Sequence, residues 1–316
     1  MDDPTGAGAL TAGGAVPGGS ASGGVPGGTA AGRSAPPGGL DEAAATRVTI
    51  PTDLDGTLVL VRHGESEMIV QRRFQGQSET PLSATGRRQA ALVARRLARP
   101  HDRPALPIPD GPPLAIVHSP LGRAAATAAA IAEEAAGSDG FGRAIPIRSD
   151  PRFLEIAQGA WEGRLSEEIA ATDGERLAAW RRTPTRVWAP GGEPLVAVRA
   201  RVAAGLDDLL AELARAGRPG SIEAPQVGGY GSDAGDQPWT ILVGHDGVFK
   251  VLLLALFDLP LERFWMWSSD LCGISVIELR AGRPVVRAMN LTEHLASLLD
   301  EEAQAETLAR ARSGAL

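Results

Sequence analysis

The chain has 316 residues, a net charge of −7 and 43% hydrophobic residues, which is enough to bury a substantial core. The acidic balance argues against a dedicated nucleic-acid binder, because affinity for phosphate backbones comes mainly from clustered Lys and Arg. The single cysteine, Cys272, excludes an internal disulfide, and the apolar run that follows it indicates a small core residue rather than a nucleophile.

The chain opens with a segment of Gly, Ala, Pro, Ser and Thr that cannot bury enough surface to offset its ordering entropy. We expect a disordered tail over 1–45, one domain over 46–300 and a polar tail over 301–316. A Gly-, Pro- and Ser-rich stretch over 218–238 is interpreted as a flexible insertion in the domain. With no signal-peptide pattern and no apolar run long enough for a bilayer, we expect a cytoplasmic protein without a membrane partner.

Apolar strands and amphipathic helices alternate through the domain. Strands that are apolar throughout and separated by helices predict a sheet covered on both faces. The expected fold is therefore a three-layer α/β/α arrangement with a mostly parallel central sheet. The expected strands cover 57–61, 114–117, 145–147, 239–243, 273–279 and 285–288, and the expected helices cover 83–99, 121–136, 166–182, 194–216, 246–257 and residues from 291 onward.

Three of the expected strands end in residues that can carry chemistry. The first leads into Arg62 and His63, the second into His118 and then Arg123, and a late strand into His245. In open α/β sheets, ligands bind beyond the carboxyl ends of the strands. The three segments therefore predict one site at a shared edge of the sheet, although His118 itself is interpreted as a strand-end residue.

Phosphoryl transfer is the chemistry that suits these residues. The transferred group spreads negative charge over three oxygens, so catalysis needs cationic donors around it and an in-line nucleophile. Arg62 and Arg123 offer planar forks for phosphate, and His245 adds a donor if it is protonated. His63 can attack phosphorus through one ring nitrogen if a backbone carbonyl holds the other.

The leaving alkoxide also needs a proton, and residues 153–163 supply two carboxyl groups. Glu155 follows two large apolar residues, so partial desolvation and a nearby phosphate would keep it protonated. Glu162 is the alternative acid. From the residues alone, either carboxyl group can be the acid, and Glu155 is the preferred candidate.

Together these segments resemble the histidine phosphatase superfamily, which includes phosphoglycerate mutases and many phosphatases. The resemblance spans about residues 58–295 and implies a phosphoglycerate mutase-like fold. The Glu155 segment is similar to the proton-donor motif of the phosphatase branch. The matching segments are Arg62-His63-Gly64-Glu65-Ser66, then 74–77 with 81–90, 119–128, 154–163 and 243–247.

The resemblance implies a mechanism residue by residue. His63 takes the phosphoryl group and becomes phosphohistidine, while Arg62, Arg123 and His245 hold the phosphate oxygens. Glu155 protonates the leaving group and then activates water. The resemblance also implies a small-molecule phosphomonoester as substrate, with neither metal nor cofactor. Possible substrate contacts are Gln75, Gly76 and Trp161.

Two other activities remain open. A phosphoglycerate mutase is less favoured because Met68 and Ile69 stand where the family often has an aromatic residue and a phosphate-gripping asparagine. Glu79 also stands where aspartate is commoner. A non-catalytic binder of phosphorylated ligands is less favoured because nucleophile and acid are both present. A haloacid-dehalogenase-like motif at 53–58 lacks the apolar strand that such a motif needs before it. The sequence indicates neither the physiological substrate nor the oligomeric state.

Overall fold

A computed structural model describes residues 47–217, 235, 237–298 and 301 of the chain. The expected N-terminal tail lies outside the described residues. So do 302–316 of the expected C-terminal tail and 218–234 of the expected insertion. Within the described part, no helix is long and apolar enough to cross a membrane.

Six strands form one sheet in the order β3-β2-β4-β1-β5-β6. The neighbours β3-β2, β2-β4 and β4-β1 are parallel, whereas β5 pairs antiparallel with both β1 and β6. The expected α/β fold with a mostly parallel sheet is therefore confirmed. The strands are β1 (Gly56–Arg62), β2 (Ile116–His118), β3 (Ile147–Ser149), β4 (Trp239–Gly244), β5 (Ile274–Arg280) and β6 (Arg283–Leu291).

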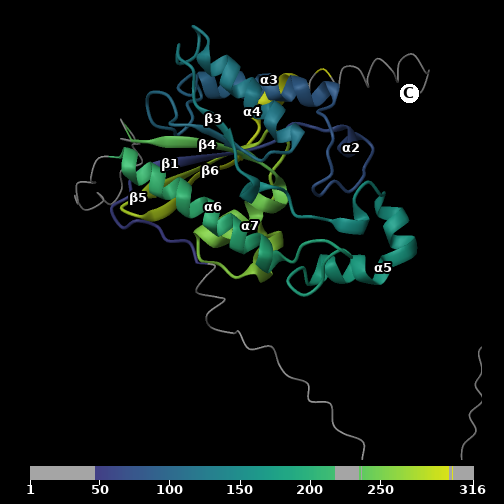
Figure 1. The fold of residues 1–316 in the computed structure, drawn as a ribbon. Coiled ribbons are helices and arrows are strands. Elements are labelled where there is room, and N and C mark those ends of the chain that lie inside the picture. Colours follow the sequence, from purple (N-terminus) through teal and green to yellow (C-terminus); the bar gives the residue numbers. More distant parts are fainter. Residues whose placement is uncertain (1–46, 218–234, 236, 299–300, 302–316) are drawn as a thin grey trace, which may run out of the picture. The chain divides into compact units, whose positions relative to one another are not determined.

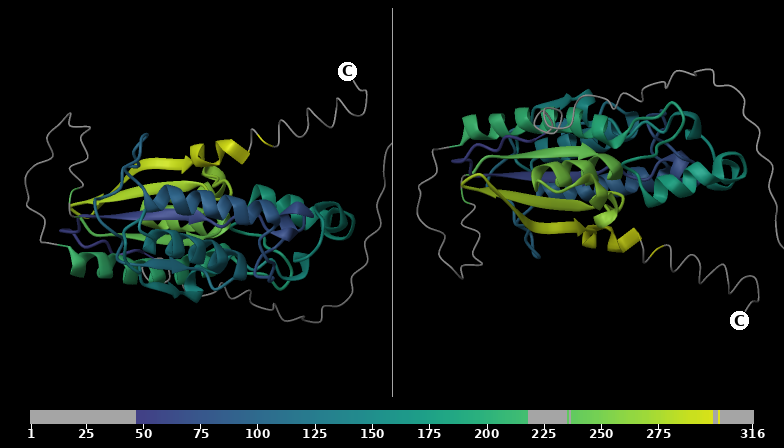
Figure 2. Two further views of the ribbon diagram at one scale, coloured as in Figure 1. Left: turned by 90° about the horizontal axis from the view of Figure 1, so that it is seen from above. Right: turned by 90° about the horizontal axis from the view of Figure 1, so that it is seen from below.

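Helices cover both faces of this sheet, with α3 and α4 on one face and α6 and α7 on the other (Figures 1 and 2). Short 3-10 turns, η1 to η4, occupy Pro151–Phe153, Gly159–Trp161, Leu261–Met266 and Glu293–Leu295. The α-helices are α2 (Glu67–Val70), α3 (Ala84–Ala98), α4 (Gly122–Ala136), α5 (Ser166–Arg182), α6 (Leu195–Ala216) and α7 (Asp246–Leu256).

Alternate side chains of β1 enter the two halves of the core. Leu58 and Leu60 belong to the cluster under α6 and α7, and Val59 and Val61 belong to the cluster under α3 and α4. Because successive side chains of a strand point to opposite faces, a strand buried on both sides must be apolar at every position. This explains the unbroken apolar runs in the sequence.

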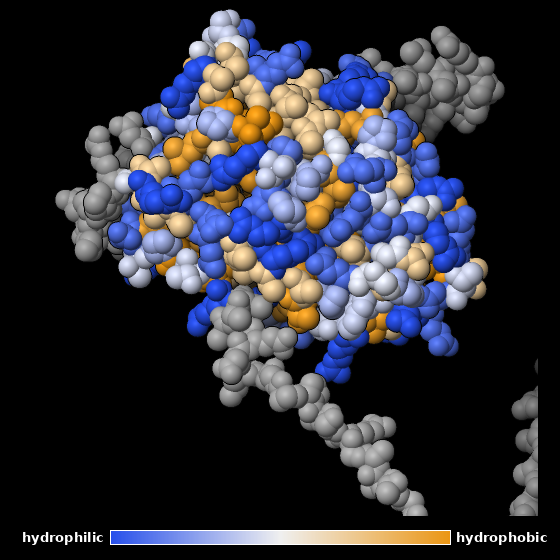
Figure 3. Space-filling view, in the orientation of Figure 1, coloured by the Kyte–Doolittle hydropathy of each residue, from blue (hydrophilic) through white to orange (hydrophobic). Residues whose placement is uncertain are grey.

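A third, smaller cluster lies beside the sheet and includes Trp161, Ile169 and Leu177, with Phe74 and Trp180 packed against it. It is built partly by α5, which stands apart from the two helical layers in Figure 1. On the face drawn in Figure 3, apolar residues form patches broken up by polar ones, a mixture that is ordinary for a protein surface.

Besides shifts of one or two residues at other element ends, the structure differs from the expected elements most clearly at α2, β3 and β6. The four-residue helix α2 was not expected, because it is too short for helical periodicity and depends on the cap that Ser66 provides. The edge strand β3 lies two residues later than expected, since its exposed residues show no apolar pattern. The strand β6 runs on to Leu291, so the helical segment expected from 291 begins later, at Glu293. It starts with a 3-10 turn, which α-helical residues 296–298 follow.

Candidate functional site

The carboxyl ends of three neighbouring strands, β2, β4 and β1, bring the expected residues together. His63 follows β1, Arg123 lies in the first turn of the helix after β2, and His245 follows β4. Their side chains are buried, with exposed fractions of 2%, 1% and 0% for His63, Arg123 and His245. The centroids of the two histidine rings are 5.0 Å apart. The sheet topology therefore places all of these groups at one edge.

The ring of His63 is held by its own main chain. Its Nδ1 lies 2.7 Å from the carbonyl oxygen of Gly64. Since a carbonyl only accepts, Nδ1 carries the hydrogen and Nε2 keeps its lone pair. Burial lowers the pKa of His63 well below 6.5, and Arg123 and Arg62 lower it further, against the raising effect of the Gly64 bond. The imidazole is thus neutral, with a fixed tautomer and an unprotonated Nε2.

Three buried side-chain nitrogens at this edge lack a hydrogen-bond partner among the described residues: Nε of Arg62, Nε of Arg123 and Nδ1 of His245. A buried polar group without a partner costs about 1–3 kcal/mol, and two of these three are guanidinium donors, which is characteristic of a site that takes an anion. Arg62 and Arg123 both line the cavity that contains His63. The arrangement suits a phosphoryl group beside the nucleophile.

The other nitrogens of both arginines are anchored to the main chain. Nη1 of Arg62 donates to Ser269 O at 2.5 Å. Nη1 and Nη2 of Arg123 donate to the carbonyls of Ser78 and Gly76 at 2.9 and 2.8 Å. Burial lowers the pKa of Arg123, while Glu155, Glu79 and Glu162 raise it. Both guanidinium groups are therefore preorganised before any ligand arrives.

The sequence predicted that His245 adds a donor if it is protonated, and its burial favours the neutral ring instead. Burial lowers its pKa well below 6.5, and the charges of His63, Arg123, Arg62 and Arg201 lower it further. Its Nε2 lies 2.8 Å from Oγ of Ser119. Either atom can donate in this contact; when Ser119 donates to Nε2, a neutral His245 carries its hydrogen on Nδ1, the ring nitrogen without a partner. A neutral ring can thus still donate to a phosphate oxygen.

The carboxylate of Glu155 faces the first turn of α7. It accepts hydrogen bonds from the amides of Ile156, Gly247 and Val248 at 2.8, 3.2 and 3.1 Å. Burial raises its pKa above 4.5, with a smaller raising effect from Asp246, against the lowering effects of Ile156, Arg123 and Gly247. Glu155 lines the same cavity as His63. It is a carboxyl group with a raised pKa beside the candidate nucleophile.

Both carboxylate oxygens of the alternative acid, Glu162, accept hydrogen bonds from neighbouring residues. Its Oε1 accepts from the amides of Gln77 and Gln158 at 3.0 and 2.9 Å, and its Oε2 accepts from Oγ of Ser78 at 2.6 Å. These bonds hold the loop after α2 in place, and Glu162 is not among the residues that line the cavity. The geometry favours Glu155 as the acid.

The cavity at this edge has a volume of about 180 Å³. Of the expected substrate contacts, Gln75 and Gly76 line it, but Trp161 does not. The Trp161 ring is buried 6.0 Å from Phe74 and 6.1 Å from Trp180, so it supports the wall from behind. The lining residues are Arg62, His63, Phe74, Gln75, Gly76, Arg123, Glu155, Ile156, Gln158, Trp180, Asp246, Gly247, Lys250, Phe264 and Trp265.

Several of these residues were not singled out from the sequence. Lys250 is buried, pairs with Asp246 at 2.5 Å and lies 5.2 Å from the ring of Trp265 and 5.5 Å from that of Phe264. A lysine inside the apolar run of α7 was the available signal, because buried lysines are rare unless paired. Ser119 had a weaker signal, its place directly after a strand. Throughout the described residues, no group of three or more His, Cys, Asp or Glu side chains could hold a metal ion.

Comparison with known proteins identifies the family. The family described as "Histidine phosphatase superfamily (branch 1)" matches residues 58–217 and 231–292. Phosphoserine phosphatase 1 of Hydrogenobacter thermophilus is 29% identical over 242 residues, 75% of this chain and 93% of that protein. A probable phosphoglycerate mutase of Enterobacter sp. (strain 638) is 38% identical over 257 residues, 77% of this chain and 96% of that protein.

A solved structure shows the same fold. Mycobacterial glucosyl-3-phosphoglycerate phosphatase in complex with inorganic phosphate matches with a TM-score of 0.54 and 30% identity, over 75% of this chain and 98% of that one. The family match covers more than half of the chain and includes every segment that meets at the carboxyl edge of the sheet. The chain therefore belongs to branch 1 of the histidine phosphatase superfamily.

Proposed function

We propose that this protein hydrolyses small phosphomonoesters, without a metal ion, through a phosphohistidine on His63. The observation that carries the proposal is the state of that ring. Its Nδ1 is bound to the Gly64 carbonyl, which leaves Nε2 unprotonated in a cavity shared with Arg62 and Arg123. Few arrangements other than nucleophilic attack on an anion need a neutral imidazole beside two arginines.

The first half-reaction forms the phosphoenzyme. Nε2 of His63 attacks phosphorus, the bond to the ester oxygen breaks, and Glu155 gives its proton to the leaving alkoxide. Arg62, Arg123 and Nδ1–H of His245 donate to the oxygens that do not leave. Burial supports the protonated form of Glu155 at this step, since it raises the pKa of that carboxyl group.

The second half-reaction returns the enzyme. Glu155, now a carboxylate, takes a proton from water, the water oxygen attacks phosphorus, and the bond between Nε2 and phosphorus breaks. The products are inorganic phosphate, a free His63 and a protonated Glu155 ready for the next cycle. Glu155 thus acts as acid and then as base from one position.

The wall of the cavity limits the size and the chemical character of the leaving group. Aromatic side chains line it, namely Phe74, Trp180, Phe264 and Trp265, and Gln158 adds an amide whose buried Oε1 has no partner among the described residues. A volume of about 180 Å³ accommodates a phosphoryl group with a small organic remainder. Relatives named for phosphoserine and for glucosyl-3-phosphoglycerate support a small organic phosphate as the substrate class.

A phosphoglycerate mutase is the second candidate, favoured by the relative of that name. A mutase must keep water from its phosphoenzyme while the intermediate reorients. Here Glu155 lies in the cavity as a base for water, and Ile69, at the position of the family's asparagine, has no polar side-chain atom for phosphate. Both features favour hydrolysis. Phosphate release from 3-phosphoglycerate faster than its isomerisation is the expected result.

Three variants test the proposal with an aryl phosphate as substrate. His63→Asn should abolish phosphate release and the acid-labile labelling of the protein by a ³²P-labelled ester. Glu155→Gln should lose about 10²–10⁴-fold with an alkyl ester. Glu162→Gln, which changes the carboxyl group outside the cavity, is the matched control and should keep its phosphohistidine. Turnover by His63→Asn, or phosphate binding by the wild type without turnover, would overturn the mechanism.

A further inference from the structure

The main chain around Glu155 is held by one side chain of α6. We propose that Arg201 is a positioning residue for the general acid, a role that rests on the proposed function of Glu155. Nη1 of Arg201 donates to the carbonyls of Arg152 and Leu154, both at 2.7 Å, and Nη2 donates to the carbonyl of Glu155 at 3.2 Å. Three carbonyls at and before the acid therefore converge on one guanidinium group.

The guanidinium group is itself fixed. Nε and Nη2 of Arg201 donate to the two carboxylate oxygens of Glu193, each at 2.8 Å, and both side chains are only 18% exposed. The amide of Glu193 also donates to the carbonyl of Ala157 at 2.9 Å. The ion pair thus contacts the main chain on both sides of Glu155, from Arg152 to Ala157.

All five N–H groups of Arg201 are used in these contacts. The segment after η1 has no ladder of its own, so its buried carbonyls need donors from elsewhere. Only a guanidinium group supplies five donors in a rigid plane, whereas a lysine has three on a flexible stem. The geometry therefore needs arginine, and a cation alone does not replace it.

As a result, Glu155 is hydrogen-bonded to residues of two helices, α6 and α7. Its carbonyl accepts from Arg201 of α6 and from Nε2 of Gln77, the latter at 2.9 Å, and its carboxylate accepts from the amides of Gly247 and Val248 in α7. If the α6 contact is lost, the main chain shifts while the carboxylate stays bound, which changes the angle at which the proton is delivered. A misplacement of about 1 Å can cost about 100-fold in rate.

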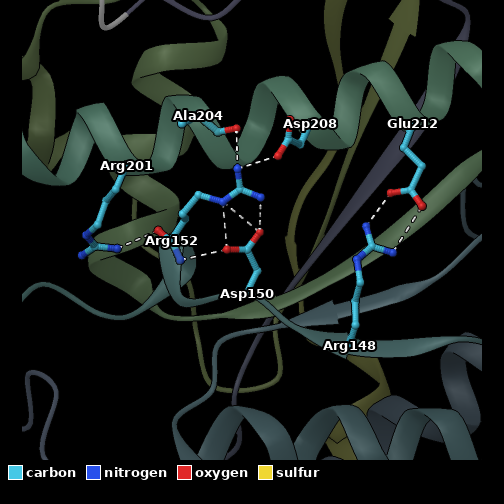
Figure 4. Close-up of polar contacts among 7 residues, drawn as sticks. All are labelled: Arg148, Asp150, Arg152, Arg201, Ala204, Asp208 and Glu212. Carbon is cyan, nitrogen blue, oxygen red and sulfur yellow. Dashed lines mark hydrogen bonds and ion pairs between the residues drawn. The ribbon is translucent and has the colours of Figure 1, made fainter.

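Figure 4 shows the remainder of the contact between this segment and α6. Arg152 donates to Asp150, Asp208 and the carbonyl of Ala204, and Arg148 pairs with Glu212. The Arg148 side chain is 44% exposed and touches none of the carbonyls next to Glu155. It ties the same segment to the same helix, which makes it a matched control for Arg201.

The test separates positioning of an acid from general damage. kcat/KM reports the steps up to the first phosphoryl transfer, and only a poor leaving group needs a proton in that step. We expect Arg201→Met to lower kcat/KM about 10- to 100-fold for an alkyl phosphate and to leave that for 2,4-dinitrophenyl phosphate near the wild-type value. Arg148→Met should leave both unchanged.

Glu155→Gln is the reference in the same experiment. If it lowers kcat/KM for both esters equally, the proposed acid is wrong. If it shows the leaving-group dependence but Arg201→Met lowers both esters equally, the positioning role is overturned while the acid stands. Arg201→Lys keeps the charge without the fork, and should lose the alkyl ester selectively even if Arg201→Met does not fold. An Arg201→Lys variant with wild-type rates on both esters would also overturn the role.

Discussion

Lowering the pH from 7.5 to 5.5 should destabilise the fold through the two histidines of the candidate site. Burial lowers the pKa of His63 and of His245 well below the ordinary 6.5. As the pH falls through 6.5, these two histidines become protonated in the unfolded chain but stay neutral in the folded chain. Their contribution to stability is therefore complete above 6.5 and is lost as the pH falls.

The magnitude follows from linkage. An unfolded histidine of pKa about 6.5 goes from about 10% to about 90% protonated over this range, which costs about 1.4 kcal/mol for each histidine that stays neutral when folded. Two such residues cost about 3 kcal/mol. Glu155 acts the other way, because burial raises its pKa and its protonation favours the folded state. A variant that removes one histidine isolates that histidine from the carboxyl groups.

Urea unfolding at the two pH values, for the wild type and for His245→Gln, measures the effect. The difference in unfolding free energy between pH 7.5 and 5.5 should be smaller by about 1.4 kcal/mol in the variant. His294→Gln is a matched variant outside the cavity, because His294 does not line it and burial lowers the pKa of His294 to about 4. It should show a similar reduction. If His245→Gln keeps the full wild-type difference, the folded ring is not held neutral and the reasoning is refuted.

Three further substitutions test the site. In Gly247→Ala the new Cβ would lie 2.6 Å from Oε1 of Glu155, so kcat/KM for an alkyl phosphate should fall about 10- to 100-fold. The affinity for inorganic phosphate, measured by calorimetry, should change little. Arg123→Lys keeps the positive charge but loses the planar pair of donors, so the inhibition constant of inorganic phosphate should rise about tenfold or more. An unchanged inhibition constant would contradict a role of Arg123 in phosphate binding. Trp265→Ala removes a half-exposed wall of the cavity and should raise KM for an aryl phosphate about three- to tenfold with little change in kcat, which initial-rate measurements would show.

Much of the site followed from local sequence because it depends on strand ends. An apolar run fixes where β1 ends, and the residue that follows it must lie at the carboxyl edge. Parallel pairing of β1, β2 and β4 then brings His63, Arg123 and His245 together without any further information. The carbonyl that holds Nδ1 of His63 belongs to the adjacent residue, so even that contact is local.

The contacts that sequence reasoning missed depend mostly on packing between distant segments. Trp161 sits behind the wall rather than in it because Phe74 and Trp180 occupy the positions next to the cavity. The protonation state of His245 depends on its burial and on the charges around it, which a sequence does not reveal. Arg201 lies on an amphipathic helix, where an arginine is typical of a solvated face, and only the fold turns it toward the acid.

The first turn of α7 explains how Glu155 would serve both half-reactions of the proposed mechanism. His245 is the N-cap residue of this helix, and the amides of Gly247 and Val248 bind Glu155. Those amides favour the carboxylate, whereas burial and Asp246 favour the acid. Burial is the largest of these effects and raises the pKa, which favours the proton that the leaving group needs. The amides oppose that rise and stabilise the carboxylate that the second half-reaction needs.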